Sequence, residues 1–229
     1  MASQIRIISS KATQHLLDEL LAMYARTSDQ KIVAEAVAGV EASKRARSGE
    51  AFDIVVLAAN VIDDLMAAGH VVAGSRVDLV CSGVSIAVRS GAPRIDISTV
   101  DAVRQAILNA KSVGYSTGPS GVYLTKLFED WGIAGTIKDR IVQAPPGVPV
   151  GQLIAEGKVE LGFQQLSELM HLQGIDVLGP LPGEMQIMTI FSAGIAATSS
   201  DPQAARQLLA FMASPEAVDA KVRNGMEPA

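Results

Sequence analysis

The 229-residue sequence predicts an α/β protein of two lobes with mostly parallel sheets. Segments that favour strands alternate with segments of helical spacing along nearly the whole chain, a pattern typical of parallel sheets covered by helices. This strand–loop–helix order starts near Ile5 and again near Ser112. Two long extended runs, 77–91 and 185–198, flank the second start, so we expect the chain to cross between the lobes twice. The predicted lobes are residues 1–83 with 191–229, and residues 84–190.

The first part of the chain predicts three strand–helix pairs. The expected elements are a strand at 5–9, a helix at 12–26, a strand at 31–37, a helix that runs to Ala46, a strand at 52–58 and a helix at 60–69. The strands are rich in β-branched residues, and the first helix repeats leucines at three- and four-residue steps. Gly69 is expected to end the third helix. This order implies helices on both faces of a mostly parallel sheet.

The remaining elements repeat the theme. They are an extended run at 77–91 with a Ser-Gly break at 82–83, a helix at 98–110, a strand at 112–116, a helix at 121–132, a strand at 140–145, a helix at 150–157, a strand at 159–164 and the extended run at 185–198. Ser98 or Thr99 is expected to cap the helix at 98–110. Two closing helices are expected, with Asp201 and Ser214 as their N-caps, because each of these residues precedes a proline, which suits the first helical position.

Composition excludes several classes of protein. The formal net charge of −5 and the pI near 5.2 indicate no general attraction to nucleic acid or to an anionic membrane. Cys81 is the single cysteine, so no internal disulfide forms, and the three histidines lack metal-ligand spacing. No run approaches the roughly 20 apolar residues of a membrane span. We expect a monomer without metal or cofactor, cytoplasmic as the sequence stands and periplasmic if a leader peptide has been removed.

Two loops of small residues stand out, each between a strand and an amphipathic helix. The first is Ser9-Ser10-Lys11, and the second runs from Ser116 to Gly121. One such loop alone is typical of an ordinary N-cap. Two of them, at the carboxyl ends of strands in different lobes, can face one another across an interlobe cleft, where open α/β sheets usually bind ligands. Bare N–H groups at helix starts suit an anion, so the pair favours an anion-binding cleft.

Five short motifs occur in order along the chain. They are ISSKATQHL (8–16), Gly39-Val40-Glu41 before a helix, PSGVYL (119–124), EGKVELGFQQLSEL (156–169) and AARQLLAFMASPEAV (204–218). Their order and spacing resemble the type II periplasmic-binding-protein superfamily, and within it the molybdate-binding branch, which also contains members similar to aconitate isomerase. The resemblance covers nearly the whole chain. It implies a two-lobe fold that binds a solute in the cleft between the lobes.

The chain departs from that branch at the expected ligand site. Molybdate binders carry Ser where this chain has Lys11, a Ser-rich loop in place of Gly39-Val40-Glu41, and a Tyr near Gln165. A Lys, a Glu and two Gln suit a carboxylate ligand better than a tetrahedral oxyanion. The residues expected to contact the ligand are Ser9, Ser10, Lys11, Gly39, Val40, Ser82, Thr117, Ser120, Gly121, Val122, Gln164 and Gln165.

Three functions remain open from the sequence. The first is a solute-binding protein that holds a small organic polycarboxylate or oxyanion for the membrane component of an ABC-type transporter. The second is a cofactor-free isomerase of a polycarboxylate, which needs an acid–base residue beside its anion-binding groups. The candidates are Lys11, His15 and Glu41, although His15 also suits a surface position and Glu41 a solvated helix start. The third is a cytoplasmic sensor without catalysis.

Overall fold

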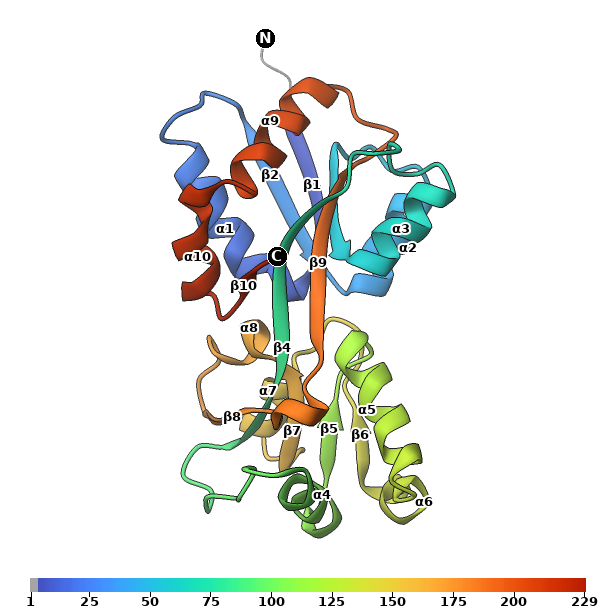
Figure 1. The fold of residues 1–229 in the computed structure, drawn as a ribbon, viewed down its shortest axis with the longest axis vertical. Helices are drawn as coiled ribbons and strands as arrows, with labels where there is room; N and C mark the ends of the chain where they lie inside the picture. The colour runs from blue at the N-terminus through green and yellow to red at the C-terminus, as the bar shows by residue number, and fades with distance from the viewer. Residues whose placement is uncertain (1–3) are drawn as a thin grey trace. The chain divides into compact units, whose positions relative to one another are not determined.

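The computed structural model describes residues 4–229 and divides the chain into two compact units (Figure 1). Unit 1 contains the residues up to Ser82 together with Ile190–Ala229, and unit 2 contains Gly83–Thr189. The chain enters unit 2 within strand β4 (Val77–Arg89) and leaves it within β9 (Met188–Ile195). Each passage is therefore a single strand, and β4 shows no break at Ser82-Gly83, where the sequence predicted one.

Unit 1 is built on a sheet with the strand order β2-β1-β3-β9-β4, and β10 (Glu227–Pro228) pairs with β4. Strands β1 (Ile5–Ser10), β2 (Ile32–Val37) and β3 (Ile54–Ala58) are parallel to one another, and β9 runs antiparallel to β3. This confirms the three strand–helix pairs that the first part of the sequence predicts.

Helices cover both faces of this sheet. One face carries α1 (Gln14–Tyr24), α9 (Pro202–Met212) and α10 (Val218–Arg223), whose apolar residues share one core with Ile5 and Ile7. The other face carries α2 (Gly39–Arg47) and α3 (Ala59–Ala67), which pack around Ile8 and Leu57. Because successive strand residues point to opposite faces, β1 contributes to both cores.

Unit 2 repeats this design with the strand order β4-β7-β5-β6, and β8 pairs with the other edge of β4. Its strands are β5 (Val113–Tyr115), β6 (Ile141–Gln143), β7 (Leu161–Gln165) and β8 (Ile175–Pro180). Its helices are α4 (Val100–Asn109), α5 (Pro119–Asp130), α6 (Ala134–Ile137), α7 (Val150–Ala155) and α8 (Leu166–Leu169). Apolar residues of α4 and α5 pack on one face, and those of α7 and α8 on the other.

Helix caps test the sequence predictions in detail. Asp201 caps α9, since its carboxylate accepts a hydrogen bond from the Ala204 N–H at 3.0 Å. Thr99 rather than Ser98 caps α4. The capping role predicted for Ser214 is wrong, because its hydroxyl hydrogen-bonds to the Glu216 carboxylate at 2.9 Å and caps no helix. A short 3-10 turn, Pro215–Ala217, therefore precedes α10.

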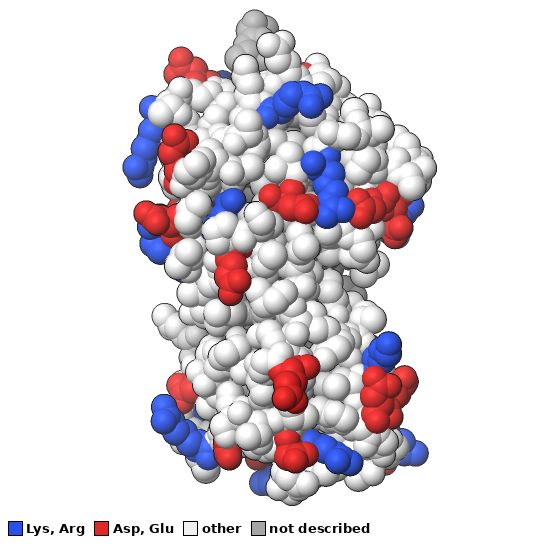
Figure 2. All heavy atoms as spheres, in the orientation of Figure 1, with Lys and Arg blue, Asp and Glu red and all other residues white. Residues whose placement is uncertain are grey.

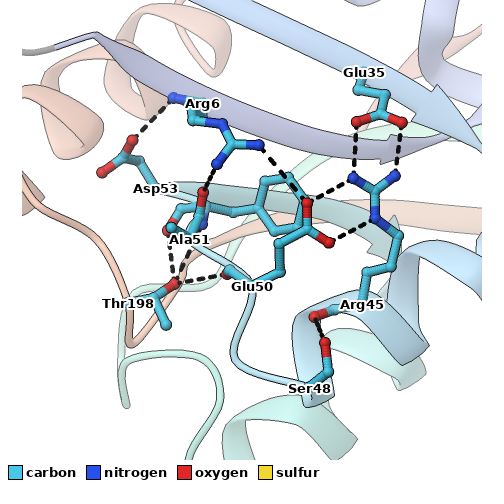
Figure 3. Close-up of polar contacts among 9 residues, drawn as sticks. Arg6, Glu35, Arg45, Ser48, Glu50, Ala51, Asp53 and Thr198 are labelled. Atoms are coloured by element: carbon cyan, nitrogen blue, oxygen red, sulfur yellow. Dashed lines mark hydrogen bonds and ion pairs between the residues drawn. The ribbon is translucent and has the colours of Figure 1, made fainter.

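Arginine side chains join the segment before β3 to the neighbouring elements of unit 1 (Figure 3). Arg45 on α2 binds the carboxylates of Glu35 and Glu50 at distances of 2.6–2.9 Å. The guanidinium carbons of Arg6 and Arg45 lie 5.1 and 5.3 Å from the Phe52 ring centroid, within cation–π range. These hydrogen bonds from Arg45 hold the pKa values of Glu35 and Glu50 below their usual range.

Charged side chains of both signs are interspersed on the face shown in Figure 2, with no large patch of one sign. Within residues 4–229, none of the helices combines the length and the apolar character that crossing a membrane requires.

Candidate functional site

In unit 1 the three parallel strands end at one edge of the sheet, and each leads directly into a helical turn. The register pairs Ser10 of β1 with Val37 of β2, and β3 ends at Ala58 on the other side of β1. Strand β1 continues into a 3-10 turn, Lys11–Thr13, and then α1, whereas β2 and β3 lead into α2 and α3. Three helical N-termini therefore meet at this edge, which we call the unit 1 edge.

None of these three helical starts has a side-chain cap. The residue before α2 is Ala38 and the residue before α3 is Ala58, and alanine has no side-chain acceptor for the first N–H groups. Alanine at such a position costs about 1 kcal/mol relative to Ser or Asp. Ser10 precedes the 3-10 turn, but its hydroxyl makes no capping hydrogen bond either. The first N–H groups of these helices thus remain available to another acceptor.

Ser10 lies at the centre of the unit 1 edge, and its hydroxyl has no hydrogen-bond partner. The residue is 7% exposed, and its Oγ is buried without a hydrogen-bond partner. A Cβ placed on Gly39 would lie 3.7 Å from the Cβ of Ser10, so the start of α2 packs closely beside it. Because an unsatisfied buried hydroxyl costs roughly 1–3 kcal/mol, native structures rarely retain one without a reason.

The neighbours of Ser10 in the first loop are already engaged within unit 1. Ser9 is fully buried, and its hydroxyl hydrogen-bonds to the Glu35 carbonyl oxygen at 3.5 Å. The half-buried Lys11 donates from Nζ to Oε1 of Gln14 at 2.9 Å. Ser9 therefore supports β2, whereas Ser10 and Lys11 lie at the unit 1 edge itself.

Other predicted residues of unit 1 lie at different depths. Val40 and Glu41 are both exposed on the first turn of α2, and Val40 is 65% exposed. His15 is exposed on the first turn of α1. Ser82 is fully buried in β4, where that strand leaves unit 1, and it is not at the end of any of the three parallel strands.

In unit 2 the predicted residues gather at the ends of β5 and β7, which are parallel neighbours. The turn after β5 is tight, because a Cβ placed on Gly121 would lie 1.7 Å from the backbone oxygen of Ser116. The Ser116 hydroxyl accepts from the Gly118 N–H at 3.2 Å and lies 3.4 Å from Oγ of Ser120. Helix α5 starts after Gly118 without a side-chain cap.

Four predicted residues of unit 2 differ in what they can offer a ligand. Thr117 is half-buried beside the start of α5, and Val122 is 69% exposed on its first turn. Gln164 accepts from the Val150 N–H and donates to Glu168, both at 2.7 Å, so it orients the start of α7. Gln165 is buried at the end of β7 and donates to the Thr189 hydroxyl at 2.9 Å.

The start of α3 at Ala59-Asn60 belongs to the unit 1 edge, although it was absent from the residues predicted from sequence. The sequence contained a signal for it: the buried strand 54–58 runs straight into a helix through alanines, with no Ser, Thr or Asp to cap it. Among the described residues, no group of three or more His, Cys, Asp or Glu side chains is arranged to hold a metal ion.

Residues 5–227 match the family of bacterial extracellular solute-binding proteins. Over 187 residues the chain is 42% identical to an aconitate isomerase from a Pseudomonas species. This alignment covers 80% of this chain and 70% of that protein. The periplasmic molybdate-binding protein of Azotobacter vinelandii superposes with a TM-score of 0.82 at 17% identity, over 98% of this chain and 99% of that one.

A sulfate-binding protein from Mycobacterium tuberculosis H37Rv superposes with a TM-score of 0.80 at 16% identity, over 99% of this chain and 87% of that one. At such identities the two structural matches establish the fold alone, and the fold is that of two-lobe type II periplasmic binding proteins, as the sequence predicted. The chain belongs to the bacterial extracellular solute-binding protein family.

Proposed function

We propose that this protein binds a small organic polycarboxylate as an extracytoplasmic solute-binding protein that serves the membrane component of an ABC-type transporter. The observation that carries the proposal is the buried, unpartnered hydroxyl of Ser10 beside the uncapped start of α2. A carboxylate oxygen at this edge would accept from that hydroxyl and from the bare N–H groups of α2 and α3. Each of these donors favours an anion, because helix N-termini carry partial positive charge.

Two further features support a carboxylate as the ligand. Lys11 has its ammonium group at the unit 1 edge. A hydrogen bond from an ammonium group to a carboxylate is charge-assisted, so it is stronger than a hydrogen bond between neutral groups. The aconitate isomerase that is 42% identical to this chain is named for a tricarboxylate. In unit 2, the proposal assigns Thr117, Ser120 and Gln165 as polar groups at the ends of β5 and β7 that can hydrogen-bond to a carboxylate. Gly121 forms the tight turn after β5, and Gln164 orients the start of α7.

Replacement of Ser10 by Ala is expected to separate binding from stability. The Ser10→Ala variant should bind trans-aconitate about tenfold more weakly by titration calorimetry, because one hydrogen bond to a charged group is lost. Its free energy of unfolding should stay the same or rise, since the removed hydroxyl is buried without a partner. Most substitutions of buried residues lower stability, so this combination is specific to a ligand-facing group.

Ser48→Ala is the matched control, because Ser48 is exposed at the far end of α2 and donates to the Arg45 carbonyl oxygen. It should leave the affinity for trans-aconitate unchanged. Equal affinity of the Ser10→Ala variant and the unchanged protein would remove Ser10 from the site. Absence of binding to trans-aconitate, citrate and other polycarboxylates by the unchanged protein would overturn the proposal itself.

Isomerisation of such a ligand is the second candidate function, and the 42% identity to an aconitate isomerase favours it. In this reaction a base removes a proton from the methylene carbon of trans-aconitate, and the electron pair shifts through the adjacent double bond. The proton then returns at the far carbon, which gives cis-aconitate without loss or gain of atoms. Lys11, His15 and Glu41 are the candidate bases, and Lys11 lies nearest to Ser10 along the chain.

Proton NMR of trans-aconitate in D₂O distinguishes the two functions. If the protein is an isomerase, catalytic amounts should produce cis-aconitate or carry deuterium into the methylene group, and Lys11→Ala should slow this if Lys11 carries the proton. The control variant Lys44→Ala changes an exposed residue of α2, and it should isomerise trans-aconitate at the same rate as the unchanged protein. A spectrum that stays constant, together with calorimetric binding, would exclude this isomerisation and leave the carrier function.

A further inference from the structure

Unit 2 contains a cavity of about 410 Å³ that the proposed polycarboxylate site does not use. It lies between strand β8 and segment 92–98, and Val88 of β4 forms part of its wall. Four residues earlier in β4, Val84 pairs with Gln165 at the end of β7. The cavity is therefore displaced along β4 from the ends of β5 and β7. Its volume falls within the range of small-molecule pockets in proteins.

Apolar side chains line part of this cavity, and charged and polar side chains line the rest. Along segment 94–98, exposed Arg94, Asp96 and Ser98 alternate with the half-buried Ile95 and Ile97. Such a period of two is that of an extended chain with one face turned to the core. The isoleucines pack against the main apolar core of unit 2, whereas the charged residues remain at the opening.

The rim carries charges of both signs. Asp176 accepts from the Ser90 hydroxyl at 2.8 Å and the Gly91 N–H at 3.0 Å, and Asp96 accepts from the Ser98 N–H at 2.9 Å. These hydrogen bonds lower the pKa values of both carboxyl groups, so both are anionic at neutral pH. Within residues 4–229, the guanidinium of Arg94 makes no hydrogen bond or ion pair.

Arg94 and Asp96 are two residues apart in segment 92–98, so their Cα atoms are at most about 7.6 Å apart. They do not pair with one another in the structure. A ligand that carries an anion and a cation close together can therefore engage both residues, while an apolar body fills the space against Ile97 and Leu178.

We propose that this cavity is a second ligand site and that it binds a free apolar α-amino acid such as leucine. The carboxylate of the amino acid pairs with Arg94, its ammonium group pairs with Asp96 or Asp176, and its side chain packs on the apolar wall. A simple anion would meet two carboxylates at the rim, and a simple cation would meet Arg94. A zwitterionic amino acid therefore suits the charges of the rim better than a simple anion or a simple cation does.

Titration of the ¹⁵N-labelled protein with L-leucine tests this site. Amide signals of residues 90–98 and 175–178 should shift, with a saturable dependence on leucine concentration. 4-Methylpentanoate, which lacks the amino group, and 3-methylbutylamine, which lacks the carboxylate, should each bind at least about tenfold more weakly. Arg94→Gln should weaken leucine binding by a similar factor, and Lys126→Gln, an exposed charge on α5, should not.

Three results would overturn the inference. The first is the absence of any shift at residues 90–98 and 175–178 up to tens of millimolar leucine. The second is equal affinity for leucine and for either of its two analogues. The third is a set of shifts confined to the unit 1 edge around Ser10 and Gly39, which would assign leucine to the solute site instead.

Discussion

The Gly121→Ala variant is expected to lose about 3 kcal/mol or more of its free energy of unfolding. The added methyl would lie 1.7 Å from the backbone oxygen of Ser116 and 3.0 Å from the Tyr115 ring. A backbone oxygen cannot rotate away, so β5 and α5 must move apart, and overpacking of this kind is among the most damaging changes in a core. Urea denaturation followed by circular dichroism measures the loss.

The control for this variant is Gly135→Ala, because, apart from its chain neighbours and the backbone of its own helix, nothing lies within 4 Å of a Cβ placed there. Gly135 lies in the short helix α6, where alanine has the higher helix propensity, so this variant should be as stable as the unchanged protein or slightly more stable. Equal stability of both variants would contradict the close approach of Gly121 to Ser116. A displaced α5 should also weaken ligand binding, since Thr117 and Ser120, which the proposal assigns to the ligand, lie at the start of this helix.

Local pattern predicted most of the fold. The strands that begin at Ile5, Ile32 and Ile54 are rich in β-branched residues, and each helix that follows has an apolar stripe of the correct period. Strand β8 was not predicted, because Gly179 and Pro180 are residues typical of loops. Its pairing partner, β4, is also distant in sequence. Helix α8 was missed because its four residues are too few to show a period.

The candidate site was predicted as a set of loops, but the chemical state of each side chain was not. Ser9 and Ser10 are adjacent and equivalent in sequence, yet only Ser9 finds an acceptor, in the Glu35 carbonyl oxygen. That difference depends on which face of β1 each residue occupies and on β2, which is more than twenty residues away. The hydrogen bond that Gln164 accepts likewise depends on the position of α7, so it cannot be predicted from the sequence pattern alone.

Asp53→Asn is expected to cost about 2–4 kcal/mol of folding free energy, although the two side chains have nearly the same shape. The Asp53 residue is 4% exposed. One carboxylate oxygen accepts from the Arg6 N–H at 2.9 Å, and the other accepts from the Ser200 N–H at 2.8 Å and the Ser199 hydroxyl at 2.9 Å (Figure 3 shows the Arg6 contact). Whichever way an amide is oriented, its NH₂ group faces a donor.

The matched control is Asp64→Asn, because Asp64 is exposed on α3 and its side chain takes no part in this cluster. It should change the free energy of unfolding by less than about 0.5 kcal/mol. Urea denaturation at neutral pH compares the two variants. A loss for Asp53→Asn no larger than that of the control would show that the contacts of Asp53 do not stabilise unit 1.

The same contacts predict how stability depends on pH. Burial acts to raise the pKa of Asp53, but the hydrogen bonds from Arg6, Ser199 and Ser200 outweigh it and hold the pKa below the ordinary value of 3.8. A carboxyl group with a lowered folded-state pKa contributes stability above its unfolded pKa and loses that contribution as the pH falls through the folded value. The unchanged protein should therefore lose stability below about pH 4 more steeply than Asp53→Asn, so that the two denaturation midpoints converge on acidification. Parallel pH profiles would contradict this assignment, because the difference between the proteins would then not involve the ionised carboxylate.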